Sequence, residues 1–466
     1  MRSPLVYFAQ HYLDCLSQAS YLIGDESTGK AVVVDPRRDV TEYVDDANEH
    51  GLTIIGVINT HFHADFLAGH LELAEATGAW IAYGAAAETE YASRSLQDGE
   101  RIVLGDVWLK VMATPGHTPE SISLLVHDGL NPEVPYGVLT GDALFIGDVG
   151  RPDLLASIGV TADELGKQLY DSIQHKLMSL PDEVRVFPAH GAGSACGKNL
   201  STELQSTIGA QRLTNYACQP MSEEQFVSIV TAGQPPAPEY FVYDAILNRK
   251  NRDVLDSDRS LRDLDADAVT AARAVGATVI DTRENLDFAA GHLTDSINIP
   301  ADGRFAETAG MVLQPGDQVV IIAAPGGEDE VATRLARIGF DSVLGFIGNV
   351  DEVLIALDDQ VEQASRLTPV QLADVIAGPV SPWVLDVRNV GELDAGTIDG
   401  AANIPLAELG RRLEEVPTDR PIVTYCAGGW RSSVAGSFLR SRGLDDVSDL
   451  AGGFAAWEAM HEPVIA

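Results

Sequence analysis

An internal repeat in the second half of the chain limits its fold more than any other feature. Residues 279–300, VIDTRENLDFAAGHLTDSINIP, match residues 384–405, VLDVRNVGELDAGTIDGAANIP, with the Asp, Arg, Gly and Asn-Ile-Pro positions in register. Each copy continues into an apolar strand, a Gly-Gly loop and a helical run. Because a repeat marks one structural unit used more than once, we expect two copies of a small α/β domain here.

The first half of the chain predicts a different α/β domain. Residues 31–36, AVVVDP, indicate a buried strand that ends in a turn, and residues 53–60, TIIGVINT, indicate another. The second strand leads into a loop rich in His and Asp, at the end of a strand where α/β layers place their sites. The Pro-rich residues 232–241, AGQPPAPEYF, are typical of a connection to the repeated part.

Length and composition agree with several domains. At roughly 150 residues per domain, the 466 residues suggest about three, and we expect them at 1–245, 258–358 and 366–466. The longest apolar runs fall short of the roughly 20 residues needed to cross a bilayer. The sequence has no signal-peptide pattern, and its four cysteines are too few for a disulfide framework. These features predict a cytoplasmic protein.

The formal net charge of −38 limits the partners of this protein. It argues against nucleic acids and anionic membranes as partners, because binding phosphate needs a basic face. An anionic substrate must find local positive charge against this background field.

Histidine and aspartate side chains gather at the ends of predicted strands in the first half. The loop THFHADF (60–66) offers three donors at alternate positions, and TPGHTPES, TGDALF and FPAHG offer one each. Small residues beside them let the loops bend and leave room for a metal. The candidate ligands are His61, His63, Asp65, His117, Asp142 and His190.

The series HxHxD, GHTP, TGDAL and PAH resembles the metallo-β-lactamase fold, an αββα sandwich, over roughly residues 1–240. Two-metal members of that fold carry a histidine after the aspartate, where this chain has Phe66. Since phenylalanine cannot ligate, we expect one ion; a second ion held weakly with waters is the alternative. One His–His–Asp set with open positions is typical of non-haem Fe(II) oxygen chemistry. Zinc hydrolases favour more nitrogen ligands or paired ions, and the residues alone leave iron or zinc open.

The stretches THFHADF, GHTPES, TGDALFIGDVGRPDL and FPAHGAGSACGK resemble the persulfide dioxygenase branch of this fold. This resemblance implies one Fe(II) per chain, with Zn as the alternative. The implied ligands are His61, His117 and Asp142. The residues implied to line or brace the site, or to hold an alternative metal, are His63, Asp65 and His190.

Three residues near this site suggest roles with the substrate. Arg151 is expected to orient Asp65 or to bind a substrate carboxylate, with an ordinary loop salt bridge as the alternative. Cys196 lies in a glycine-rich loop six residues after His190, and Lys198 close by would favour a thiolate. This cysteine is expected either to hold or receive sulfur beside the metal or to be a small buried filler.

Cys426 has neighbours that suit a nucleophile. In YCAGGWRSS (425–433) it follows an apolar strand and precedes a glycine-rich loop and a helix start. Backbone N–H groups around Gly428 and Gly429, the helix N-terminus and the charge of Arg431 favour a thiolate that can carry an extra sulfur atom. With LDVR, GAANIP and LAGGFAAWE, this motif resembles the rhodanese fold over residues 366–466.

The first repeat departs from this pattern at the decisive place. Ala324 stands opposite Cys426, and GGEDE replaces GGWRSS. Residues 258–358 therefore resemble a rhodanese domain without its chemistry, which we interpret as a spacer or docking surface.

Together the resemblances imply a multidomain α/β and α+β protein, a metallo-β-lactamase sandwich followed by two rhodanese-like domains. This arrangement is similar to fused persulfide dioxygenase–sulfurtransferases of bacterial sulfide detoxification. The metal site would oxidise a low-molecular-weight thiol persulfide with O2 to sulfite, and the rhodanese cysteine would form thiosulfate or supply persulfide. These small molecules are the expected partners, and a homodimer or tetramer is expected.

Two alternatives stay open at this point. One is a zinc-dependent glyoxalase II-like thioester hydrolase fused to a sulfurtransferase. The other is a non-catalytic protein whose Cys426 reports persulfide to a partner. Glutathione, coenzyme A, bacillithiol and mycothiol all remain candidates for the thiol carrier.

Overall fold

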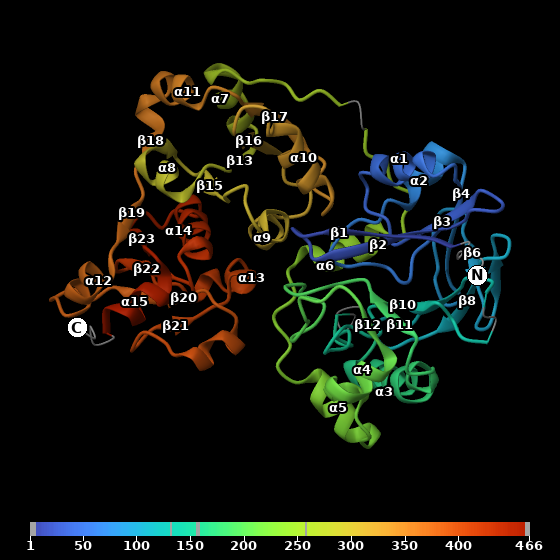
Figure 1. Cartoon of the computed structure of the whole chain (residues 1–466). Coiled ribbons are helices and arrows are strands. Elements are labelled where there is room, and N and C mark those ends of the chain that lie inside the picture. The colour runs from blue at the N-terminus through green and yellow to red at the C-terminus, as the bar shows by residue number, and fades with distance from the viewer. Residues whose placement is uncertain (1–5, 131–132, 155–158, 257–258, 462–466) are drawn as a thin grey trace, which may run out of the picture. The chain divides into compact units, whose positions relative to one another are not determined.

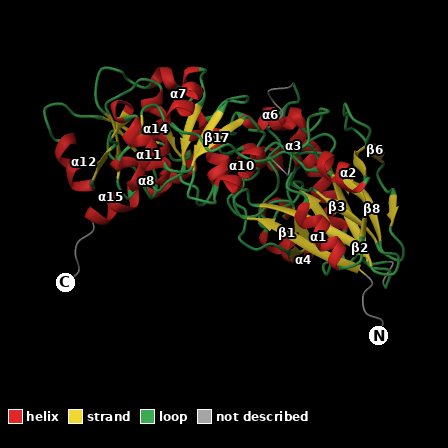
Figure 2. Cartoon of the chain, turned by 90° about the horizontal axis from the view of Figure 1, so that it is seen from above, coloured by secondary structure: helices red, strands yellow, loops and turns green. Residues whose placement is uncertain are grey.

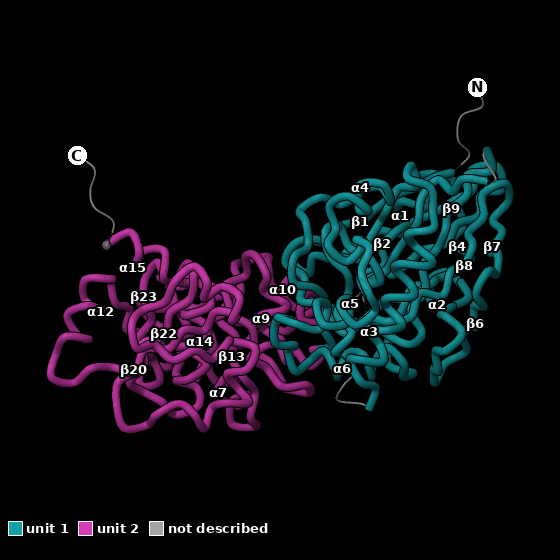
Figure 3. The backbone as a smooth tube through the Cα atoms, turned by 90° about the horizontal axis from the view of Figure 1, so that it is seen from below, with its two compact units in different colours: residues 1–257, 337–339 teal, residues 258–336, 340–466 magenta. Residues whose placement is uncertain are grey.

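The computed structural model describes residues 6–130, 133–154, 159–256 and 259–461 (Figure 1). Two compact units divide the chain (Figure 3). One comprises Met1–Ser257 with Arg337–Gly339, and the other Asp258–Ala336 with Phe340–Ala466. No helix in the described ranges is long and apolar enough to cross a membrane. The finer boundaries expected at 245, 258, 358 and 366 stay predictions.

The first unit contains two six-stranded sheets, whose strands are yellow in Figure 2. One sheet has the order β1-β2-β3-β4-β5-β6 and the other β12-β11-β10-β9-β8-β7. The strands of the first sheet are β1 (Val6–Leu13), β2 (Gln18–Asp25), β3 (Lys30–Val34), β4 (Thr53–Ile58), β5 (Trp80–Gly84) and β6 (Arg94–Leu96). The strands of the second sheet are β7 (Arg101–Val103), β8 (Trp108–Ala113), β9 (Ile122–His127), β10 (Gly137–Gly141), β11 (Arg185–Pro188) and β12 (Ser206–Thr207).

Helices cover the outer faces of both sheets. Tyr43 packs with Val33 of the first sheet, and Leu169 and Phe226 pack with Val138 of the second. The helices of this unit are α1 (Thr41–Glu49), α2 (His70–Thr77), α3 (Ala162–Asp171), α4 (Ile208–Thr214), α5 (Glu223–Thr231) and α6 (Tyr240–Leu247).

Alternate residues of β3 face two different cores. Val32 and Val34 share a buried cluster with Leu124 of the second sheet, whereas Val33 shares one with Tyr43 of α1. Successive side chains of a strand point to opposite faces, and a strand covered on both faces is apolar throughout. The layers are therefore helix, sheet, sheet and helix, which confirms the αββα sandwich predicted from the sequence.

The second unit contains two parallel sheets that repeat one topology. The order β15-β13-β16-β17 in the first corresponds to β21-β20-β22-β23 in the second, where β19 adds an edge strand. The strands of the first sheet are β13 (Thr278–Asp281), β15 (Ile297–Asn298), β16 (Val319–Ile322) and β17 (Val343–Ile347). The strands of the second are β19 (Ser365–Leu367), β20 (Trp383–Asp386), β21 (Ala402–Asn403), β22 (Ile422–Tyr425) and β23 (Val447–Leu450). A separate antiparallel pair consists of β14 (His292–Leu293) and β18 (Val361–Glu362).

Helices follow these strands as the repeat predicted. The helices of the first copy are α7 (Ala266–Ala274), α8 (Asn285–Ala290), α9 (Phe305–Val312), α10 (Glu328–Ala336) and α11 (Val350–Ala356). The helices of the second are α12 (Pro369–Ile376), α13 (Leu406–Leu409), α14 (Trp430–Ser441) and α15 (Gly453–His461). Helix α12 begins with a capping box, in which Thr368 and Gln371 satisfy each other's backbone N–H groups. Both expected α/β domains are therefore present.

Candidate metal centre and cysteine loop

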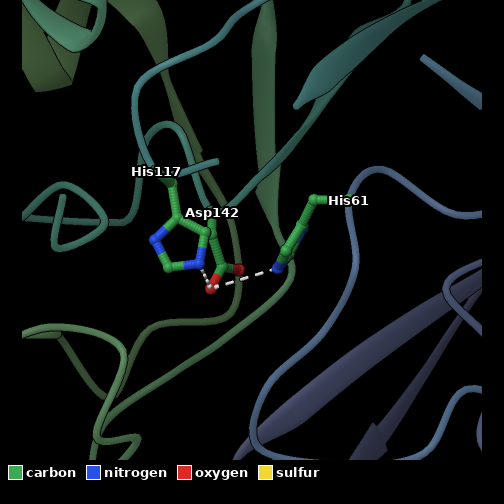
Figure 4. A group of neighbouring side chains, drawn as sticks. All are labelled: His61, His117 and Asp142. Atoms are coloured by element: carbon green, nitrogen blue, oxygen red, sulfur yellow. Dashed lines mark ion pairs between the residues drawn. The ribbon is translucent and has the colours of Figure 1, made fainter. Parts of the chain in front are cut away.

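Three buried side chains from separate strand ends meet in the first unit (Figure 4). His61 follows β4, His117 lies between β8 and β9, and Asp142 directly follows β10. Their ligand atoms all lie within 4.8 Å of one another. From Asp142 Oδ2, His61 Nε2 is 3.8 Å away and His117 Nε2 is 3.5 Å away. Each of the three residues is 1% exposed, so bulk water has little access to them.

Neighbouring oxygens orient both imidazole rings. Nδ1 of His61 lies 3.0 Å from Thr60 Oγ1, and Nδ1 of His117 lies 2.8 Å from the Arg151 carbonyl oxygen. A hydrogen bond donated by Nδ1 leaves the lone pair on Nε2, which points toward Asp142. Burial lowers the pKa of His117 to about 4 and the pKa of His61 well below its ordinary value. Both rings are therefore neutral at pH 7, the form that binds metals.

Polar atoms in the middle of this group lack partners of their own. Among the described residues, His61 Nε2 and both carboxylate oxygens of Asp142 are buried without a hydrogen-bond partner. Burial raises the pKa of Asp142 to about 6, because removal from water disfavours its charged form. Buried polar groups without partners are rare, and a divalent cation would satisfy all of these atoms. The donor set, two nitrogens and one carboxylate, therefore fits a metal ion.

A second group of donors adjoins the first. Ligand atoms of His63, Asp65 and His190 also lie within 4.8 Å of one another. His190 Nε2 lies 3.5 Å from Asp142 Oδ1, and His63 Nε2 lies 3.0 Å from Asp35 Oδ1. The structure thus brings together all six candidates from the sequence.

Phe66 lies against this second group. Its ring is fully buried, with its centroid 4.3 Å from that of His63 and 6.5 Å from that of His190. An apolar ring therefore occupies the space beside these donors that a further metal-ligating side chain would need.

Asn248 positions the loop of residues 60–66, and no motif in the sequence indicated this residue. This fully buried residue follows α6 and donates from Nδ2 to the carbonyl oxygens of His63 and Phe66, at 2.8 and 2.9 Å. Its Oδ1 accepts from Ala68 N at 2.9 Å. Glu120 braces the same loop, since its Oε1 accepts from the backbone N–H after His61. Glu120 lies within the quoted stretch GHTPES, so its motif was a signal, whereas Asn248 gave none.

Arg151 takes the alternative role, a loop salt bridge. Its guanidinium makes a two-pronged contact with Asp153, with both distances 2.7 Å, and donates to the carbonyl oxygens of Ala195 and Pro235. Asp153 takes the place of the expected partner Asp65, because a carboxylate two residues away matches the planar fork; binding of a substrate carboxylate stays a prediction. Arg151 still serves the site through its carbonyl oxygen, which orients His117.

Cys196 lies beside the metal group, but its surroundings do not favour a thiolate. Its ligand atom lies within 4.8 Å of those of Asp142 and His190, and the residue is 1% exposed. Burial, with the nearby carboxylates of Asp65 and Asp142, raises the pKa of its thiol well above the ordinary value.

Lys198 differs from the expectation. Its ammonium donates to the carbonyl oxygens of Ile229 and Ala232, at 2.7 and 2.9 Å. It therefore stabilises the C-terminal end of α5, and its charge is engaged there instead of activating Cys196.

The Cys426 loop connects β22 to α14. Cys426 follows β22 and is 2% exposed, and its Sγ accepts a hydrogen bond from Gly429 N at 3.2 Å. Gly429 has φ +95° and precedes the first residue of α14. The backbone after Gly453 also holds this loop in place, since Phe454 N donates to the Cys426 carbonyl oxygen at 2.7 Å. The Gly429 N–H, at the N-terminus of α14, therefore faces the sulfur.

Arg431 is held by a carboxylate. Its Nη1 and Nη2 contact Glu392 Oε2 and Oε1 at 2.7 and 2.6 Å. This pair offsets much of the charge that we expected Arg431 to lend to Cys426. Arg431 still interacts electrostatically with Cys426, and Gly429 N–H adds a hydrogen bond to the sulfur.

The corresponding loop of the first repeat is built differently. Gly327 N donates to the Ala324 carbonyl oxygen at 2.8 Å, and the first turn of α10 carries three acidic residues. Negative charge at this helix start would repel an anionic sulfur donor.

Comparison with known proteins finds family matches in three segments of the chain. The description "Metallo-beta-lactamase superfamily" matches residues 13–190, and "Rhodanese-like domain" matches residues 265–353 and 368–460. The human protein "Persulfide dioxygenase ETHE1, mitochondrial" is 30% identical over 223 residues, which are 47% of this chain and 78% of that protein. "Hydroxyacylglutathione hydrolase cytoplasmic" from Arabidopsis thaliana is 32% identical over 184 residues, which are 38% of this chain and 66% of that protein.

A solved structure resembles more of the chain. A metallo-beta-lactamase from Staphylococcus aureus subsp. aureus COL superposes with a TM-score of 0.67 and 34% identity. The match covers 73% of this chain and 98% of that one, so it continues beyond the first unit into the repeated part.

Proposed function

Because this chain belongs to the metallo-beta-lactamase superfamily, as a homologue of persulfide dioxygenases with two rhodanese-like domains, we propose that it oxidises a low-molecular-weight thiol persulfide to sulfite and transfers sulfur through Cys426. Overall, the persulfide RSSH, O2 and water give RSH and sulfurous acid, which ionises to sulfite. The chemistry belongs to sulfide detoxification. The expected homodimer or tetramer stays a prediction.

The proposal rests chiefly on the group of His61, His117 and Asp142, with Phe66 beside the adjoining donors. Two neutral imidazoles and one carboxylate suit one Fe(II). Bound Fe(II) would supply open positions for O2 and the persulfide sulfur. The buried side chains around it would limit access of bulk water, and Thr60 and the Arg151 carbonyl would keep both rings in the ligating orientation.

Cys426 would carry the sulfur in the second step. Its thiolate attacks the outer sulfur of a persulfide, whose S–S bond breaks to release RS⁻. Sulfite then attacks the outer sulfur of the Cys426 persulfide, which forms the S–S bond of thiosulfate and returns the thiolate. Gly429 N–H, 3.2 Å from Sγ, would stabilise the negative charge at both stages.

The first test loads the protein anaerobically with Fe(II) and follows dissolved O2 after glutathione persulfide is added. Uptake that needs both iron and persulfide supports the dioxygenase. Thioester hydrolysis by the zinc-loaded protein, without O2 uptake by the iron-loaded protein, would instead favour the glyoxalase II-like alternative.

Two variants test the assigned residues. His117→Ala should lose iron and O2 uptake, whereas His127→Ala should keep both, because His127 is also buried but stacks on Trp108 and is not one of the grouped donors. Retained iron in His117→Ala would reject this ligand. Cys426→Ser should stop thiosulfate formation and leave sulfite formation, whereas Cys218→Ser, at another buried cysteine, should change neither.

A further inference from the structure

From the contacts within the second unit, we infer that the rhodanese-like domain without a cysteine positions the Cys426 loop through Asn298 and Asp302. These are positioning residues, because they act on the loop and do not touch the sulfur. This inference rests on the proposed function only where turnover is measured as sulfur transfer through Cys426. The contacts themselves do not depend on that function.

Asn298 fixes the helix that begins at the Cys426 loop. It lies in β15 of the first repeat and is fully buried. Its Oδ1 accepts from Ser433 Oγ at 2.8 Å, and its backbone N–H donates to Ser437 Oγ at 3.0 Å. Ser433 and Ser437 are one turn apart on α14, so both contacts lie on one face of that helix. Together they restrain both the rotation and the translation of α14 relative to the neighbouring domain.

Asp302 reaches the loop itself. Its Oδ1 accepts from Trp430 Nε1 at 2.9 Å, and Trp430 is the first residue of α14, next to Gly429. Arg334 of α10 supports Asp302 by donating to the carbonyl oxygens of Ala301 and Gly303, the latter at 2.7 Å. The helix that follows the cysteine-less loop of one domain therefore supports the contact to the cysteine loop of the other.

The repeat shows which part of this arrangement is special. Asn403 is the counterpart of Asn298, and each asparagine donates from Nδ2 to two carbonyl oxygens of its own domain. These bonds belong to the shared fold. The contacts of Asn298 with Ser433 and Ser437 are made to the other domain, in addition to that shared pattern.

A displacement of α14 would change the reactivity of Cys426. Gly429 N–H lies 3.2 Å from Sγ and directly precedes α14, so a tilt of the helix moves this donor away from the sulfur. A thiolate that loses a hydrogen bond is less stabilised. We therefore expect a slower catalytic step, with binding of the sulfur donor nearly unchanged.

A double-mutant cycle between Asp302→Ala and Trp430→Phe tests the inference in the full-length protein. Each single variant should slow iodoacetamide labelling of Cys426 at neutral pH, followed by mass spectrometry, by about threefold to tenfold. The double variant should be no slower than the slower single variant, because both remove the same contact. In thiosulfate formation, kcat should fall while KM for glutathione persulfide stays nearly constant.

Two further variants separate this role from general effects. Asp302→Asn keeps the acceptor oxygen and should retain most of the labelling rate. Asp287→Ala removes an exposed carboxylate from α8 of the same domain and should have no effect. Effects that are additive, or equal to that of Asp287→Ala, would overturn the inference. Non-additive labelling in a protein that transfers no sulfur would uphold it and reject the proposed function instead.

Discussion

Replacing Asn248 by alanine should weaken both the first unit and its metal site. The change removes two hydrogen bonds to the carbonyl oxygens of His63 and Phe66 and one from Ala68 N. All three belong to a residue with no exposed surface, so water does not replace them. At about 1 kcal/mol for each buried hydrogen bond, the first unit should lose about 3 kcal/mol of unfolding free energy.

The loss should extend to metal binding, because the segment that is released carries His63 and Asp65 and follows His61 directly. Residues that hold ligands in place typically contribute tenfold or more to metal affinity, so Asn248→Ala should release Fe(II) to a chelator at about tenfold lower chelator concentration. Urea unfolding measures the first effect, and anaerobic chelator titration measures the second.

Asn215→Ala is the matched control. Asn215 is also fully buried, donates from Nδ2 to the carbonyl oxygens of Phe145 and Asp148, and accepts from Ala217 N. Its loss should destabilise the unit by a similar amount while Fe(II) affinity stays closer to that of the unchanged protein. Equal Fe(II) affinity in the two variants would refute the positioning role of Asn248.

Three other changes have defined outcomes. Gly453→Ala should lower thiosulfate formation at least tenfold more than Gly443→Ala. Both glycines have positive φ, but only at Gly453 would a Cβ meet the Cys426 carbonyl oxygen, at 2.4 Å. Equal losses in the two variants would contradict this reasoning. Burial raises the pKa of Glu72, but Arg252 and Arg38 outweigh it and lower the pKa to about 2. Because the folded pKa lies below the unfolded one, the difference in unfolding free energy between wild type and Glu72→Gln should be about 3 kcal/mol at pH 7 and shrink as pH falls from about 4.5 toward about 2. Urea unfolding from pH 7 to about 3 measures this, and a constant difference would count against it. With a net charge of −38, the unfolding temperature should rise as NaCl increases to about 1 M, where the Debye length is about 3 Å; a temperature independent of salt would remove self-repulsion as a factor.

Local patterns were enough to predict the repeat and the donors of the metal group, and the family resemblance of the motifs implied the αββα layers. Val32, Val33 and Val34 are apolar in succession because each faces one of two cores, and this is visible in the sequence. The donors follow strand ends beside small residues, so topology brings them to one place. The residue that replaces the cysteine in the first repeat, Ala324, was equally apparent from the alignment of the two copies.

Partners of polar side chains depended on the tertiary structure. No sequence pattern pairs Asn248 with His63, 185 residues away. None shows that Glu392 binds Arg431 or that the C-terminal end of α5 binds Lys198. A charged or amide group binds whichever complementary atoms the fold brings within about 3 Å, and desolvation makes that choice decisive when the group is buried. The sequence by itself therefore determined which chemical groups this protein has and near which strand ends they lie, while the tertiary structure decided which of them face the metal group and Cys426 and which are held by other partners.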